Sequence, residues 1–74
     1  MIIKFSRKLY DSAAIQTAVD AYRGLADFKI KNLPDYLEVE IKNIDRRLEN
    51  NLSNEFCNFV LAKTKEYAGI KRSN

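Results

Sequence analysis

The stretch DFKIKNLPDYLEVEIK, residues 27–42, decides the fold. Apolar and charged residues alternate on both sides of a central NLPD, and this two-residue period is typical of half-buried strands. Pro34 presets the backbone for a turn, and Asp35 follows it. The stretch therefore predicts an antiparallel hairpin in which two lysines face two glutamates across the strands. These are Lys29, Lys31, Glu38 and Glu40; the apolar side holds Phe28, Ile30, Leu37, Val39 and Ile41.

Before the hairpin, the sequence predicts a strand and then a helix. Residues 2–9 alternate, with Ile3, Phe5 and Leu9 on one side, which predicts a strand over these residues. From residue 12 the apolar positions follow a helical period, at Ile15, Ala18, Val19 and Tyr22. Asp11 or Ser12 is expected to cap the start of this helix, and Gly24 is expected to end it in the left-handed conformation.

After the hairpin, the sequence predicts a second helix. Within LSNEFCNFVLAKTKEY, residues 52–67, the apolar side chains gather in a stripe about 100° wide, which is expected to face the sheet. The segment DRRLENN, residues 45–51, either begins this helix or forms a preliminary turn. The helix is expected to run to about Ala68 and to stop at Gly69. The stripe holds Leu52, Phe56, Phe59, Val60 and Tyr67.

The predicted order is β-α-β-β-α, an α+β fold forming one small domain over residues 1–74. The first and second strands are joined through a helix, and this right-handed crossover leaves room for one strand between them. The third strand fills that gap. We therefore expect an antiparallel sheet in the order 1-3-2 with both helices on one face, a ferredoxin-like arrangement that lacks its last strand.

The composition argues against catalysis by this chain. It has one cysteine and no histidine, so neither an internal disulfide nor a zinc site with the usual ligand spacing is expected. Cys57 has no histidine to act as its base, and we interpret it as a small half-buried apolar residue rather than a nucleophile. Two glycines, each at a helix end, form no phosphate-binding loop. We expect no enzyme activity and no cofactor.

The expected function is to bind another protein or peptide. Lys4 and Arg7 interrupt the apolar start of the chain, which predicts neither a signal peptide nor a membrane span, and we expect a cytoplasmic location. In the order 1-3-2 the first strand has an unpaired edge, which is a template for a partner strand or for a second copy in a homodimer. The predicted interface comprises Ile2, Lys4, Ser6, Cys57, Asn58 and Leu61.

A nucleic-acid-binding module is the alternative. Its surface would be the open face of the sheet, where lysines could contact phosphates. RNA-binding sheets stack bases on aromatic side chains, whereas this face offers one tyrosine and has two glutamates at its centre. The net charge of +3 is modest. The predicted open face holds Ile2, Lys4, Lys29, Lys31, Tyr36, Glu38, Glu40 and Lys42.

The second helix also resembles a known family. Residues 52–61 match the pattern L-x-x-E-F-x-N-x-x-L of the D component of His-Xaa-Ser peptide-modification systems, through Leu52, Glu55, Phe56, Asn58 and Leu61. The element A-x-x-A-Y at residues 18–22 is similar to that family as well. The resemblance implies an accessory protein that acts beside radical-SAM maturases on a ribosomally made peptide. The iron–sulfur chemistry would then belong to those partners.

Overall fold

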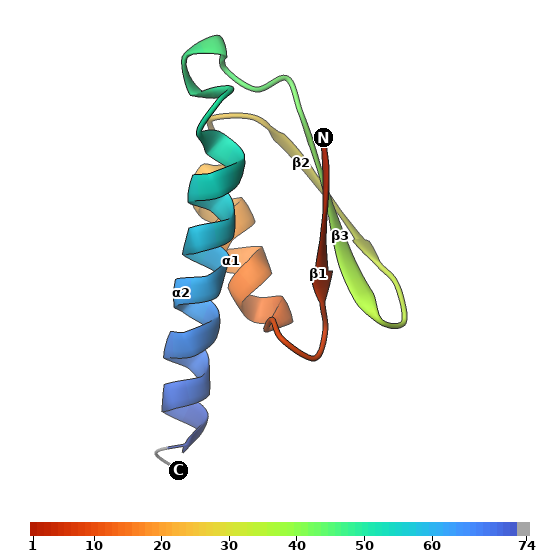
Figure 1. The fold of residues 1–74 in the computed structure, drawn as a ribbon, viewed down its shortest axis with the longest axis vertical. Coiled ribbons are helices and arrows are strands. Elements are labelled where there is room, and N and C mark those ends of the chain that lie inside the picture. Colours follow the sequence, from red (N-terminus) through yellow and green to blue (C-terminus); the bar gives the residue numbers. More distant parts are fainter. Residues whose placement is uncertain (73–74) are drawn as a thin grey trace.

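The computed structural model describes the backbone of residues 1–72 and the side chains of residues 1–69. Three strands form one antiparallel sheet in the order β1-β3-β2, and both helices lie on the same side of it (Figure 1). The predicted α+β class and strand order are confirmed. The elements are β1 (Ile2–Ser6), α1 (Ser12–Tyr22), β2 (Asp27–Asn32), β3 (Tyr36–Lys42), a 3₁₀ turn (Arg46–Leu48) and α2 (Leu52–Arg72).

The register of the hairpin is the one that its charge pattern predicts. Lys29 lies opposite Glu40 and Lys31 lies opposite Glu38, so opposite charges meet across β2 and β3. The other side of β3 faces the helices, and its three apolar side chains are buried there. These are Leu37, Val39 and Ile41.

An aromatic cluster forms the centre of the core. Phe56 of α2 is fully buried. Its ring lies 5.3 Å from that of Phe28, 5.8 Å from Tyr22 and 6.1 Å from Phe5, so it joins α2 to both outer strands and to α1. The two helices also meet at a hydrogen bond of 2.8 Å between the hydroxyls of Thr17 and Tyr67. The predicted stripe of α2 therefore does face the core.

The first strand is shorter than predicted. It ends at Ser6, because the chain turns there: the Ser6 carbonyl accepts hydrogen bonds from the amides of both Leu9 and Tyr10. Leu9 is consequently 70% exposed, and its predicted place beside Ile3 and Phe5 is wrong. Tyr10 takes that place instead, with its ring 5.1 Å from Phe5 in an edge-on contact.

Gly24 follows the C-cap residue of α1, as predicted, but not in the left-handed conformation, and Gly69 does not stop α2. Gly24 has no positive φ; α1 ends at Tyr22 with Arg23 as its C-cap, and the Tyr22 carbonyl accepts a tight-turn hydrogen bond of 2.9 Å from Leu25. Gly69 lies inside α2, which continues to Arg72. A glycine allows a left-handed residue or a helix end but requires neither, which is why the local pattern was wrong about the conformation of Gly24 and about the stop at Gly69.

The segment between β3 and α2 is a preliminary turn. Asp45 begins it by accepting a hydrogen bond of 3.0 Å from the Arg47 amide, and α2 then starts at Leu52. The Arg47 side chain also donates to the Asp45 carboxylate, and these bonds lower the pKa of that carboxyl. The open alternative at residues 45–51 is thereby settled. At the N-terminal end of α1, Asp11 is the cap, and it accepts from the Ala13 amide at 2.8 Å.

Candidate functional site

The backbone of β1 presents hydrogen-bonding groups at the edge of the sheet. Met1 and Ile41 exchange two hydrogen bonds, of 2.8 and 3.0 Å, and the Arg7 amide donates to Asp35 at 3.1 Å. In antiparallel pairs, residues that bond to the neighbour alternate with residues that do not. Ile3 and Phe5 therefore also turn their backbone groups toward β3. Those of the residues between them point outward.

We call these outward groups the β1 edge; they belong to Ile2, Lys4 and Ser6. The Ser6 carbonyl is already used by the turn that follows the strand. The groups available to hydrogen-bond with a partner strand are therefore the N–H and C=O of Ile2 and Lys4 and the N–H of Ser6. Three of the predicted interface residues thus lie in one row, on alternate positions of one strand.

One side of α2 lies next to the loop that follows β1. The Asp11 amide donates to the Thr64 hydroxyl at 3.3 Å, and Thr64 and Ala68 line a shallow depression together with residues 7–11. The opposite side of α2 contacts α1, since the rings of Phe59 and Tyr22 lie 5.6 Å apart. At 3.6 residues per turn, Cys57 and Leu61 continue the row of Thr64 and Ala68. We call these four residues the α2 flank.

Cys57 and Leu61 make the α2 flank an apolar border along one side of the helix. Cys57 is half-buried and packs against the core, whereas Leu61 is 39% exposed. Asn58 does not belong to this border. It lies about 200° around the helix from Phe56, on the outer surface, and its side chain is exposed. Of the six predicted interface residues, three thus lie on the β1 edge, Cys57 and Leu61 lie on the α2 flank, and Asn58 lies apart from both.

Cys57 lies in surroundings that disfavour the reactive form of a thiol. Burial raises the pKa of Cys57, so the thiolate is scarcer near neutral pH than for an exposed cysteine. A nucleophilic cysteine needs the opposite shift, from a base or from a positive field. The geometry is that of a half-buried packing residue.

The open face of the sheet carries charge in ordered rows. Glu38 of the central strand pairs with Lys4 on one side and with Lys31 on the other. In the neighbouring row, Glu40 lies between Ile2 and Lys29. Each glutamate is therefore flanked by at least one lysine, and the middle of this face is not a continuous positive surface.

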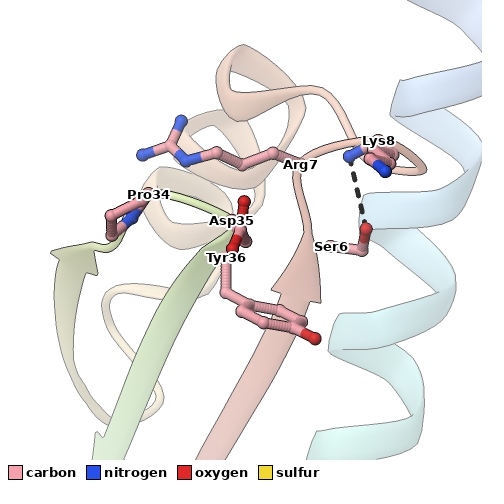
Figure 2. Close-up of a pocket in the computed structure, with 6 residues that line it drawn as sticks. All are labelled: Ser6, Arg7, Lys8, Pro34, Asp35 and Tyr36. Carbon is pink, nitrogen blue, oxygen red and sulfur yellow. Dashed lines mark hydrogen bonds between the residues drawn. The ribbon is translucent and has the colours of Figure 1, made fainter.

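Arg7 links the end of β1 to the hairpin loop, a role that the sequence pattern did not predict. Its Nε donates to the Leu33 carbonyl at 2.7 Å and its Nη2 donates to Asn32 Oδ1 at 3.0 Å. Figure 2 shows its side chain extending from the end of β1 toward Pro34, across the end of the hairpin. No periodicity could reveal this contact, because the partners are separated by 25 and 26 residues.

Arg7 borders an open depression of about 520 Å³ at this end of the sheet, which is the site drawn in Figure 2. Its lining places two cations near one carboxylate and one exposed tyrosine ring. The guanidinium of Arg7 is already engaged with the hairpin. The lining residues are Ser6, Arg7, Lys8, Pro34, Asp35 and Tyr36.

Comparisons with protein-family models, with curated proteins and with solved structures found no match. The likeness to ferredoxin-like domains and the resemblance to the peptide-modification family therefore stay predictions. Within the described part of the chain, neither helix has both the length and the apolar character needed to cross a bilayer. Nor do the described residues bring three or more Cys, Asp or Glu side chains together as a metal-binding group.

Proposed function

We propose that this protein is a small interaction module that accepts an extended segment of another protein as a fourth strand beside β1. The observation that carries the proposal is the β1 edge, with its row of outward backbone groups at Ile2, Lys4 and Ser6. A strand added there would form main-chain hydrogen bonds, which supply affinity, and would meet the α2 flank, which supplies contacts for side chains.

The β1 edge is better suited to this role than the other edge of the sheet. β2 carries Asp27, Lys29 and Lys31 among its six residues, and charged side chains protect an edge strand from pairing. β1 carries only Lys4 among its five. Ile2 is also 55% exposed, so the strand presents apolar surface that a partner would cover.

The resemblance to the D component of His-Xaa-Ser systems extends this proposal. On that basis the partner would be a radical-SAM maturase or the peptide that such an enzyme modifies. In the structure, residues of the matching pattern at positions 52–61 differ in burial. Leu52 and Phe56 are fully buried, whereas Asn58 and Leu61 are exposed and available to a partner.

The test compares proline and threonine at one position. Lys4→Pro removes an outward N–H that β3 does not use, and Lys4→Thr keeps that N–H while removing the same charge. We expect wild type to retain a partner from the native cells, Lys4→Thr to retain it with a loss no larger than one charge pair, and Lys4→Pro to lose it. Amide hydrogen exchange should be fast at Ile2, Lys4 and Ser6 in the isolated monomer and slow in the complex. Thermal melts establish that both variants fold.

The nucleic-acid alternative predicts different results. Binding to single-stranded RNA would weaken steeply with salt, and Lys29→Glu or Lys31→Glu on the open face would reduce it. The β1 amides would exchange equally fast with and without RNA. A tight, salt-sensitive RNA complex of this kind, together with partner capture that survives Lys4→Pro, would overturn the interaction proposal.

A further inference from the structure

We propose that the strand accepted at the β1 edge has alternating chemistry: acidic side chains toward the open face of the sheet and apolar side chains toward the helices. This inference rests on the proposed function and adds the class of partner. Three features of the structure carry it: the charge row that ends at Lys4, the absence of acid from the first ten residues, and the apolar border on α2.

The charge row crosses the whole sheet. Lys31, Glu38 and Lys4 lie opposite one another on β2, β3 and β1, so the signs alternate from one strand to the next. Lys4 ends this row at the open edge, and among the side chains that the structure describes it makes no ion pair. A residue directly opposite Lys4 on an added strand would lie about 5 Å away, and opposite charges at that position stabilise pairing. An acidic residue would continue the alternation.

The positive charge continues beyond the end of β1. Residues 1–10 contain Lys4, Arg7 and Lys8 and no acidic residue. Arg7 is held in place by its two bonds to the hairpin, and Figure 2 shows Lys8 on the other side of the same loop. Arg7 is therefore turned toward the hairpin, and an acidic segment that runs along the free edge of β1 would meet Lys8 as the further cation.

The same charges argue against a second copy of this chain as the occupant. Pairing of β1 with β1 must match outward groups with outward groups, which places Lys4 opposite Ile2, Lys4 or Ser6 of the other copy. None of these registers gives Lys4 an acidic neighbour, because the segment holds none. Each register also brings two basic segments side by side, and like charges at such distances are destabilising.

The apolar side chains proposed for the partner strand follow from the surface that the strand would meet on the helix side of the sheet. Side chains of an added strand alternate between the two faces of the sheet. Those on the helix side would lie beside Ile3, which is partly buried, on the face of the sheet that carries α2 with the exposed Leu61. Polar side chains placed there would lose hydration without a hydrogen-bonding partner. Apolar side chains are therefore expected at these alternate positions.

The experiment uses two synthetic peptides of about eight residues, roughly the length of an ordinary strand. One alternates valine with glutamate and the other alternates valine with lysine. Binding to the full chain is followed by the amide signals and hydrogen exchange of Ile2, Lys4 and Ser6. We expect the glutamate peptide to protect these amides and to bind about tenfold more tightly, because the residue opposite Lys4 and its two diagonal neighbours change sign between the two peptides.

Two charge-reversal variants distinguish peptide binding at the β1 edge from an effect of charge elsewhere on the sheet. Lys4→Glu should reverse the preference, so that the lysine peptide binds more tightly. Lys31→Glu is the matched control, since Lys31 lies opposite the same Glu38 but on the far edge. Both variants place a third carboxylate beside Glu38 and Glu40, so their melting temperatures should fall alike, while Lys31→Glu should keep the preference for glutamate.

The outcomes distinguish this inference from the proposed function. If both peptides protect the β1 amides equally, strand docking stands and the acidic preference is wrong. If neither peptide protects them, the proposed partner chemistry is wrong, and the proline and threonine variants alone decide whether a strand docks. If protection instead rises with protein concentration in the absence of peptide, together with dimer formation in sedimentation, the occupant is a second copy and this inference is overturned.

Discussion

Phe56 shows how a single residue holds the elements of this chain together. It is fully buried and contacts the rings of Phe5, Tyr22 and Phe28. We expect Phe56→Ala to lower the free energy of unfolding by about 3–5 kcal/mol, the range for a buried aromatic residue. Asn58→Ala, two residues further on the exposed surface, should change it by less than about 0.5 kcal/mol. Urea unfolding of both variants checks this, and the reverse ranking would show that the phase of α2 is wrong.

Asn43 is a second decisive residue, because it has a φ of 54° at the end of β3. Asparagine tolerates this left-handed conformation, and its side chain donates to Asp27 at 2.7 Å. Asn43→Val should lower the free energy of unfolding by about 1–2 kcal/mol, the cost of a left-handed backbone for an ordinary residue. Asn43→Gly should be nearly neutral, since glycine adopts this φ freely. Equal denaturant midpoints for the two variants would contradict the prediction.

At the scale of the element, α2 continues through a glycine. Gly69 lies within the helix, and a Cβ added there would meet nothing within 4 Å apart from its chain neighbours and the backbone of its own helix. Gly69→Ala should therefore increase helicity and stabilise the chain by up to about 1 kcal/mol, the difference in helix propensity between the two residues. Circular dichroism and thermal unfolding measure both effects. A destabilised alanine variant would instead indicate that the helix ends at this residue in the left-handed conformation.

The elements also differ in how far their local sequence specifies them. β3 and the buried side of α2 lie where their periodicity predicts, because each of these patterns runs for several residues and matches one face of a strand or helix. β1 ends early for a reason outside its own pattern. Its pairing with β3 finishes at Ser6, opposite Tyr36, and the next residues turn back onto the Ser6 carbonyl.

At the scale of the whole molecule, the burial of one titratable side chain on each helix makes the free energy of unfolding fall at alkaline pH. Burial raises the pKa of Tyr22, with a smaller contribution from Glu55, and burial also raises the pKa of Cys57. Both groups lose their protons more readily in the unfolded chain. Their contribution to stability is therefore complete below the unfolded pKa values and declines as the pH rises through the folded ones.

Urea midpoints measured between about pH 8 and 10 should consequently fall, over the range in which thiols and phenols titrate. Cys57→Ala should make the first part of this decline shallower, because it removes the group that titrates first. A midpoint that rises over this range, or an identical slope in the alanine variant, would contradict the assignment of these shifts to burial.

The sequence by itself determined the kinds of element, their order and the sides that they bury. It determined the hairpin as well, because the two-residue alternation around Pro34 leaves only one way to place apolar side chains together and opposite charges across from one another. The exclusion of a histidine-dependent site also follows from composition alone.

Tertiary structure decided the geometry of the candidate site. Which amides of β1 point outward depends on its register with β3, and a shift of one residue would exchange the two sets. The place of α2 beside α1 and the loop after β1 depends on contacts between distant residues, such as Asp11 with Thr64 and Thr17 with Tyr67. A periodic pattern shows which side of an element is buried, but it carries no information about the neighbour on each flank, because that neighbour is chosen by packing over the whole chain.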